Sequence, residues 1–376
     1  MPAQPARVGH FFVPKDYKDQ FEGILNSNQI AYMSAITDIK KYLEEEDDAF
    51  AKAALKRSGN AKFYTEIHRY DEVNEYMERM AREYPSIVKF EEAGKTFQGR
   101  PINYLKISTT NFQDTTKPIV FLQSLLHARE WVTLPATLYA IEKLLVNVTE
   151  SDLVNDLDWI IMPIANPDGY EFTHTNSRFW RKNRRDGIMI ANLCVGVDLN
   201  RNFDSFWSTE SSSSVCSDVY HGSRAFSEPE TQAIKSIFDK YSDRIGFYAD
   251  IHSFGSIILW GYGNGQLPPN ALQLQLVGVN SAQAIDNVKW QSKPNYVVGN
   301  IMHILYAASG GSTDYASAIG VPLSFCYELP GHINTNGVNG FLVQPEFVQQ
   351  AGEETWEGLK VVARYVRDNN LKNIAV

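Results

Sequence analysis

The sequence predicts an α/β fold in which a largely parallel or mixed sheet is covered by helices on both faces. Strand-like and helix-like segments alternate from about residue 100 to the C-terminus, which is typical of this class. Several strand-like segments are apolar at nearly every position, as expected for strands buried on both faces. With 376 residues, of which 44% are hydrophobic, the chain can also bury a large core without a metal or a disulfide.

The expected strands and helices follow one another in a simple order. Strands are predicted at residues 102–108, 119–126, 158–166, 245–253, 256–262 and 321–330. Helices are predicted at residues 131–147, 227–244, 271–286 and 345 to about 369. Ser227 is a candidate cap of the second of these helices, and Pro229 fits its first turn. Polar residues at the ends of the strands should hold the chemistry.

The N-terminal part differs from the rest of the chain. Residues 1–48 predict a short helix around residues 21–25, a strand at 30–34 and a second helix that ends in an acidic run. Residues 49–60 form a small, basic connecting segment that contains Lys56 and Arg57. An exposed Lys-Arg pair between two folded parts is where a trypsin-like protease would cut. We therefore place a domain boundary near residue 60, with the main domain at 61–376.

Composition excludes several classes of partner. The formal charge of -9 would repel the phosphates of a nucleic acid. There is no run of 18 apolar residues to span a bilayer, and residues 1–20 lack the apolar centre of a signal peptide. Cys194 and Cys216 flank a Ser-rich segment and could close it with a disulfide, whereas buried thiols are the default in a cytosolic protein. The sequon at Asn147 also favours an extracellular protein.

A metal site is predicted near the segment FLQSLLHAREW at residues 121–131. His127 and Glu130 are three residues apart at a strand-to-helix junction, so on one helical turn they could face the same point. Alone the pair is weak, because a Glu at a helix start is often only favourable to the helix dipole. His252 ends another strand; it could be a hydrogen-bonded core residue or the third ligand. Two His and one Glu with an open position for water are an established catalytic zinc set.

Other polar residues have both a structural and a chemical interpretation. Asp198 is a turn residue or the acceptor of the second ring N–H of a ligating His. Glu328 ends an apolar strand, where a charge is costly without a partner, and beside a metal it becomes a candidate general base. Arg181 lies in a basic tract that could be a solvated loop. Arg201, between two Asn residues, could hold a carboxylate.

The chain also resembles a known family through seven segments in order. These are HAREW, NPDGY, FWRK, VDLNRNF, IHSFG, ASGGSTDY and YELPG. From about residue 61 to the end they are similar to zinc metallocarboxypeptidases of the digestive A/B type. The resemblance implies a twisted mixed parallel and antiparallel sheet between helices. It also implies a monomeric enzyme that hydrolyses the C-terminal peptide bond of peptides and proteins.

The resemblance assigns roles to individual residues. His127, Glu130 and His252 would bind one zinc ion, with Glu328 as general base and Arg181 polarising the scissile carbonyl. The remaining roles are the carboxylate-binding residues Asn200, Arg201 and Tyr306, the subsite residues Arg129 and Ser253, the His127 partner Asp198, and the disulfide of Cys194 with Cys216.

Side-chain preference should depend on the pocket floor, which the resemblance places at Thr313. The residues expected around it are Gly263, Ile301, Leu305, Ala308 and Cys326. B-type enzymes carry an acid at the floor, so an uncharged pocket favours aliphatic or aromatic residues, the A-type preference. Asp250, at a possible wall position, could instead admit basic residues. Two departures from the family pattern are Leu125, where Gly is common, and Phe254, where Tyr is common.

Residues 10–48 resemble the later half of the family's inhibitory pro-segment. This implies a secreted zymogen that a trypsin-like protease activates, in an N-terminally incomplete form. Competing classes are disfavoured, because serine hydrolases need G-x-S-x-G and thermolysin-like enzymes need H-E-x-x-H, and neither occurs. A homologue that kept only peptide binding should have lost a ligand or the base, and all four residues are present.

Overall fold

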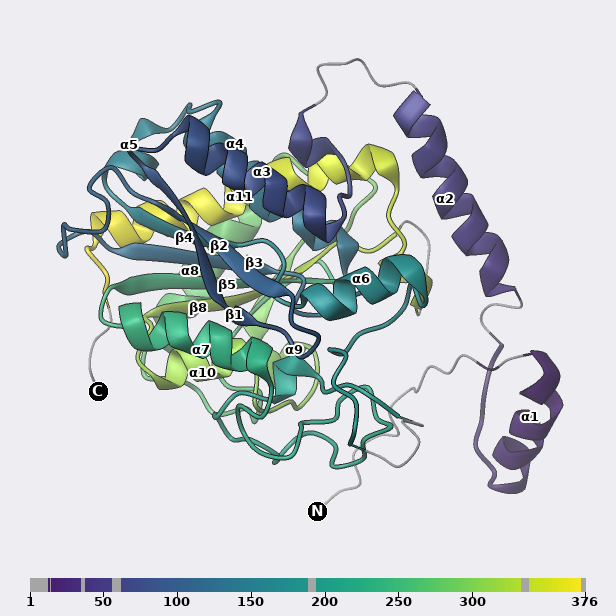
Figure 1. The fold of residues 1–376 in the computed structure, drawn as a ribbon. Coiled ribbons are helices and arrows are strands. Elements are labelled where there is room, and N and C mark those ends of the chain that lie inside the picture. Colours follow the sequence, from purple (N-terminus) through teal and green to yellow (C-terminus); the bar gives the residue numbers. More distant parts are fainter. Residues whose placement is uncertain are drawn as a thin grey trace.

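An eight-stranded mixed sheet forms the centre of the computed structural model (Figure 1). The structure describes residue 13 and residues 15–34, 38–55, 62–188, 194–332 and 338–372. Across the sheet the strand order is β1-β2-β4-β3-β5-β8-β6-β7. The strands are β1 Val88–Lys95, β2 Pro101–Ile107, β3 Ile119–Ser124, β4 Asp158–Met162, β5 Ile245–Ser253, β6 Ile257–Trp260, β7 Val297–Asn300 and β8 Leu323–Leu329.

The central strands run parallel, from β4 through β3 and β5 to β8. The antiparallel pairs are β1 with β2, β2 with β4, and β6 with β8. Strands β3 and β5 are buried at every position, which explains their continuous apolar sequences. Because parallel strands end at the same edge, the segments after β3, β5 and β8 meet there.

Helices cover both faces of the sheet, in two separate apolar clusters. One face packs against α3, α4, α8 and the long α11, which contacts both α4 and α8. The other face packs against α7 and α10. There the Phe238 ring of α7 contacts Tyr248 of β5 and Tyr315 of α10. The α-helices are α1 Lys18–Ser27, α2 Ile39–Leu55, α3 Tyr70–Glu83, α4 Leu134–Leu145, α5 Ser151–Asn155, α6 Pro167–Thr175, α7 Pro229–Tyr241, α8 Ala271–Asp286, α9 Ile301–Ile304, α10 Ser312–Ala318 and α11 Pro345–Asp368.

The predicted fold class is confirmed, but several local predictions are wrong. Residues 30–34 form no strand, because no described strand lies beside them to complete a ladder. Ser227 is not the cap of α7; Glu228 holds that position, and its side chain makes no capping hydrogen bond. Helix α4 starts only after a 3-10 turn at Trp131–Thr133. The sequence prediction also missed α3, although its Tyr and Met residues recur at helical spacing.

The N-terminal helices lie apart from the sheet in Figure 1. Helix α1 has no buried residue, and α2 has one, Glu46. The expected boundary after residue 48 falls inside α2, which continues to Leu55. The predicted cleavage site at Lys56 and Arg57 lies outside the described residues.

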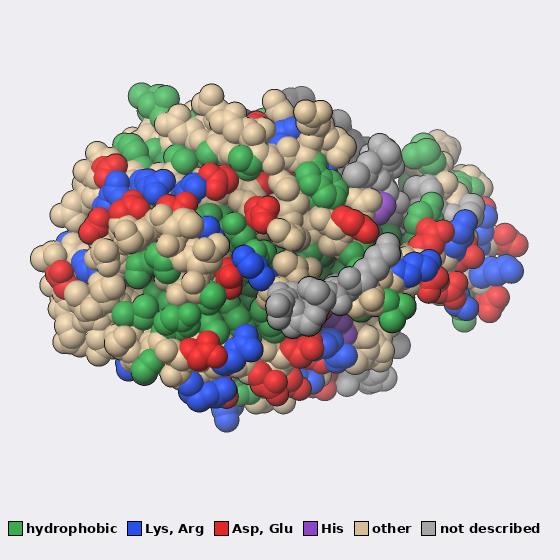
Figure 2. All heavy atoms as spheres, turned by 90° about the horizontal axis from the view of Figure 1, so that it is seen from above, with side chains coloured by type: hydrophobic (Ala, Val, Ile, Leu, Met, Phe, Trp, Pro, Cys, Tyr) green, Lys and Arg blue, Asp and Glu red, His purple; other side chains and the backbone are tan. Residues whose placement is uncertain are grey.

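The surface carries charged side chains of both signs. On the face in Figure 2, described basic and acidic side chains are interspersed and do not gather in one basic stripe. Within the described ranges, every helix is too short or too polar to cross a bilayer.

A partly buried imidazole makes the fold sensitive to acid. The His174 ring stacks on Trp131 with ring centroids 4.1 Å apart, and the indole Nε1 donates to Thr173 Oγ1 at 2.8 Å. Burial lowers the pKa of His174 to about 3, and the nearby Arg69 charge acts in the same direction. The folded chain therefore resists a proton that the unfolded chain, with a His pKa near ~6.5, accepts.

We expect stability to fall as pH drops from about 6.5 towards 3, with His174 contributing a slope of up to about 1.4 kcal/mol per pH unit. His174→Phe keeps an aromatic ring on Trp131 and should remove this contribution. The measurement is the free energy of unfolding by denaturant at neutral pH and at about pH 4.5. His303→Phe is the control, since that ring is exposed on α9. An unchanged slope in His174→Phe contradicts the assignment.

Candidate active site

A tight turn between β3 and α4 carries the first two site residues. The Glu130 N–H donates to the His127 carbonyl at 3.3 Å, so the two residues belong to a turn and not to the helical turn that we predicted. Thr133 Oγ1 donates to the Glu130 carbonyl at 2.8 Å and accepts from the Leu125 N–H at 3.3 Å. The turn is thereby tied to both elements that flank it.

Leu125 begins this turn in a left-handed backbone conformation, with φ of 53°. Such a value favours Gly, because a Cβ atom crowds the following carbonyl. The Leu125 side chain is fully buried in the core, and this burial offsets part of the cost. The departure from Gly at this position is therefore compatible with the turn.

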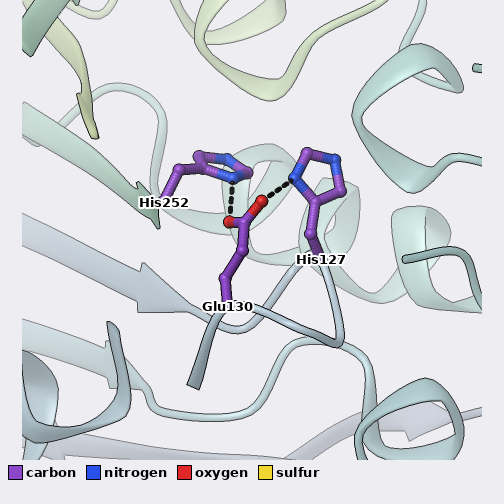
Figure 3. A group of neighbouring side chains, drawn as sticks. All are labelled: His127, Glu130 and His252. Atoms are coloured by element: carbon purple, nitrogen blue, oxygen red, sulfur yellow. Dashed lines mark hydrogen bonds and ion pairs between the residues drawn. The ribbon is translucent and has the colours of Figure 1, made fainter. Parts of the chain in front are cut away.

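The structure brings His127, Glu130 and His252 together (Figure 3). One carboxylate oxygen of Glu130 lies 2.9 Å from His127 Nδ1, and the other lies 2.9 Å from His252 Nδ1. One ligand atom from each residue lies within 4.8 Å of the others, and all three side chains are buried. Two imidazole nitrogens and a carboxylate oxygen are a donor set that suits zinc. The geometry of the described residues therefore fits a zinc ion.

Glu130 and His252 carry shifted pKa values. Burial alone would raise the pKa of Glu130, but the two neighbouring imidazoles outweigh burial and lower it. Burial would lower the pKa of His252, but Asp250 and Glu130 outweigh it and raise that pKa well above its ordinary value. A divalent cation that binds here takes the place of protons on the imidazoles.

Asp198 links the cluster to Arg181. One of its oxygens lies 3.0 Å from His127 Nε2, and the other accepts from Arg181 Nη2 at 2.9 Å and Nε at 3.1 Å. Burial would raise the pKa of Asp198, but Arg181 and His127 hold it well below its ordinary value. Arg181 Nη1 also lies 3.9 Å from Glu130 Oε1. The Arg181 guanidinium is thus held beside the group of His127, Glu130 and His252.

Glu328 lies on β8 directly beside His252 of β5 in the register of the sheet. Its side chain is partly exposed, unlike its strand neighbours. Burial raises the pKa of Glu328 to about 8, and the Glu130 charge adds to this effect. The positive charge of a bound divalent ion would draw that pKa down again.

A short 3-10 turn, Leu199–Arg201, follows Asp198 and presents the expected carboxylate-binding residues. Arg201 donates from Nη1 to the Asn200 carbonyl at 2.6 Å and from Nη2 to the Tyr306 hydroxyl at 3.4 Å. Asn200 accepts at Oδ1 from the Ser312 N–H at 2.9 Å. Asn200, Arg201 and Tyr306 therefore form one connected group.

The two expected subsite residues also lie near the cluster. Arg129 donates to the Phe179 carbonyl at 3.1 Å and lies over the Phe341 ring, 4.5 Å from its centroid. The Ser253 N–H donates to Glu130 Oε2 at 3.1 Å. Ser253 thus supports the carboxylate between the two imidazoles through its main chain.

The residues expected around the pocket are uncharged and mostly buried. Thr313, Ile301, Ala308 and Cys326 are buried, whereas Leu305 is exposed. Gly263 accepts from the Ala308 N–H at 2.9 Å, and its own N–H donates to Asp314 Oδ1 at 3.2 Å. A Cβ at Gly263 would lie 2.1 Å from the Ala308 carbonyl oxygen, so this close approach requires glycine.

Asp250 makes contacts that sequence reasoning missed. It was expected as a possible charge on the pocket wall, but its Oδ2 lies 2.8 Å from His252 Nε2 and accepts from Ser312 Oγ. The available signal was the D-x-H spacing in β5, which places both side chains on one face of the strand. Cys194 and Cys216, which the resemblance pairs, form a disulfide with a Cα–Cα distance of 5.0 Å.

Comparison with known proteins places this site in a family. Residues 73–358 match the family model described as zinc carboxypeptidase. The chain belongs to the zinc carboxypeptidase family. It is therefore a metallocarboxypeptidase of the A/B type, a zinc enzyme that acts on peptides with a free C-terminus.

Relatives of this carboxypeptidase carry both type names. Carboxypeptidase B of Helicoverpa zea is 40% identical over 96% of this chain and 86% of its own. Carboxypeptidase A1 of Bos taurus is 32% identical over 98% of this chain and 86% of its own. The crystal structure of carboxypeptidase A from Helicoverpa armigera is 56% identical, with a TM-score of 0.89 over 95% of this chain and 88% of its own. Side-chain preference must therefore be argued from the pocket.

Proposed function

We propose that this carboxypeptidase releases aliphatic and aromatic C-terminal residues and is made as a secreted, monomeric zymogen. The observation that carries the catalytic part is the meeting of His127, Glu130 and His252 beside Glu328. Zinc, when bound by the first three residues, polarises the scissile carbonyl and acidifies a water molecule. The protein supplies the remaining functions.

Arg201, Asn200 and Tyr306 recognise the C-terminal carboxylate of the peptide substrate. The guanidinium of Arg201 pairs with the substrate carboxylate, and the amide and the hydroxyl donate further hydrogen bonds. An internal peptide bond offers no carboxylate to this group, so the enzyme acts as an exopeptidase. Arg129 and Ser253 contact residues further from the C-terminus.

Proton transfer and charge stabilisation are divided between two side chains. Glu328 accepts a proton from the attacking water and returns it to the leaving amine. Arg181, held by Asp198, donates to the carbonyl oxygen as negative charge develops there, which stabilises the transition state more than the bound substrate.

Glu328→Gln should lower kcat by about 10²- to 10⁴-fold while the protein still binds zinc, because the amide cannot take the proton. Turnover of a Phe-ended peptide and zinc content by elemental analysis measure the two properties. Glu354→Gln, which changes a buried carboxylate on α11, is the control and should keep wild-type turnover. A loss of less than about tenfold contradicts the role of Glu328.

The A-type preference rests on the charges that face the pocket. Thr313 is uncharged, and the carboxylate of Asp250 is already shared by His252 and Ser312. Because His252 already shares the negative charge of Asp250, a basic side chain that entered this pocket would lose its water for a weakened counter-ion, which costs several kcal/mol. An apolar side chain gains by the same burial.

We expect the cleaved enzyme to favour a Phe- or Leu-ended peptide over a Lys-ended one by about 100-fold or more in kcat/KM, from the cost of burying an unpaired ammonium. Thr313→Asp should raise the rate with the Lys-ended peptide by providing that partner. Thr313→Val is the matched control and should keep the wild-type order. A wild-type enzyme that prefers Lys would be of the B type.

The zymogen proposal rests on a buried ion pair between α2 and the main domain. Arg178 donates from Nε to Glu46 Oε2 at 2.8 Å and from Nη2 to Oε1 at 3.1 Å. The same guanidinium lies 3.6 Å from the centroid of the Trp131 ring and donates to the Arg129 carbonyl at 2.9 Å. Glu46 also accepts from the Val343 N–H at 2.7 Å. Arg178 thereby links helix α2 to the turn that carries His127 and Glu130.

Two further features support the secreted zymogen. The Cys194–Cys216 disulfide favours an oxidising compartment. Lys56 and Arg57 follow α2 in sequence and provide the site for a trypsin-like protease that separates α2 from the main domain.

Glu46→Gln should raise the activity of the uncut chain by at least about 10-fold, since breaking a buried ion pair costs about 3–5 kcal/mol. Peptide hydrolysis before and after trypsin treatment measures the effect. Glu44→Gln on the same helix is the control, because its side chain is exposed. If Glu46→Gln leaves the uncut activity unchanged, α2 is not the inhibitory element; if trypsin leaves wild-type activity unchanged, the chain is no zymogen.

A further inference from the structure

We propose that Asp250 is the positioning residue of His252, a second carboxylate–histidine pair at the metal centre beside that of Asp198 and His127. The proposal rests on the proposed role of His252 as a zinc ligand. It assigns Asp250 to metal binding and not to recognition of the substrate side chain.

The geometry of β5 places the two side chains together. Asp250 precedes His252 by two residues, so both lie on the same face of the strand. Asp250 Oδ2 lies 2.8 Å from His252 Nε2, and Nδ1 of the same ring faces Glu130 Oε2 at 2.9 Å. With a proton on Nε2, Nδ1 presents its lone pair to a metal. Asp250 therefore selects the tautomer that can bind zinc.

The second polar neighbour of His252 Nε2 cannot replace Asp250. Asn200 Nδ2 lies 3.3 Å from Nε2, but an amide NH₂ group donates and does not accept. Its carbonyl Oδ1 is occupied by the Ser312 N–H. Among the described contacts of Nε2, Asp250 is the acceptor.

Asp250 is itself held in place and shielded from water. Its side chain is fully buried, and Ser312 Oγ at the start of α10 donates to the same oxygen that faces His252. Asp198 shares its charge with Arg181, whereas among the described residues no Lys or Arg forms an ion pair with Asp250. The charge of Asp250 is therefore directed at His252, which increases the basicity of this imidazole as a ligand.

A competing role uses the other oxygen of Asp250. Oδ1 is buried and has no hydrogen-bond donor among the described residues. Its strand neighbour is Cys326, one of the expected pocket residues. An incoming basic side chain could pair with Oδ1, and the experiment must separate this role from metal binding.

The test measures the zinc dissociation constant of the full chain carrying Asp250→Asn, by competition with a chelator. We expect zinc to bind about 10- to 100-fold more weakly than in wild type, the effect of removing an outer partner of a ligand. Ser312→Ala removes the donor that orients Asp250 and should shift the constant in the same direction, by a smaller factor. This second variant tests the proposal even if Asp250→Asn fails to fold.

Asp158→Asn is the matched control. Asp158 is also a fully buried carboxylate of the sheet, but it pairs with Arg244 and Lys117 at the opposite end of the parallel strands. Its loss should lower the free energy of unfolding and leave the zinc dissociation constant unchanged. The comparison separates metal binding from a general loss of stability.

His252→Ala distinguishes this inference from the proposed function. It should weaken zinc binding more than Asp250→Asn does. If His252→Ala leaves zinc binding unchanged, the proposed ligand set is wrong. If it weakens zinc binding while Asp250→Asn and Ser312→Ala do not, the inference about Asp250 alone is overturned.

The substrate comparison addresses the competing role. At saturating zinc, Asp250→Asn should keep the wild-type ratio of kcat/KM for Phe-ended and Lys-ended peptides. A selective loss of the Lys-ended substrate together with unchanged zinc affinity would reassign Asp250 to side-chain recognition and overturn the proposal.

Discussion

The carboxylate of Glu130, held between two imidazoles, is the interaction on which the rest of the site depends. Both of its oxygens face a ring nitrogen, and the side chain is almost fully removed from solvent. A buried carboxylate without positive partners would cost several kcal/mol, so the fold must deliver both imidazoles to this point. Each imidazole then needs an acceptor for its second nitrogen, and Asp198 and Asp250 meet this need.

Sheet topology makes this arrangement possible. The parallel strands β3, β5 and β8 end at one edge, where His252 and Glu328 are direct neighbours in the register and the turn after β3 brings in His127. His252 and Glu328 are carried by strands of the sheet, and Thr133 ties the turn of His127 to the elements that flank it. The expected substrate contacts come instead from a 3-10 turn and from the segment around Tyr306. In the proposed function, the sheet and the turn after β3 therefore carry the reaction chemistry, and loop segments contact the peptide.

Sequence reasoning succeeded where a periodic pattern determines the structure. Helix α8 has the predicted bounds, and β5 was identified from its apolar run. It failed where tertiary contacts decide: α10 lies in a segment of small residues with little helical signal, and residues 30–34 lack a neighbouring strand. The contact of Asp250 with Ser312 could not be derived either, because it depends on how α10 packs against β5. Residue types suggest chemistry, but partners follow from packing.

For the zymogen proposed above, the contact between Arg178 and Glu46 has a consequence for how α2 would leave the main domain. In the intact chain the helix and its docking surface are tethered, so their effective concentration is high and fixed. Cutting the chain after α2 would break the tether but not the ion pair, so release then obeys mass action. Dilution of the cleaved protein promotes dissociation, and a concentrated solution retains the fragment as a competitor in trans.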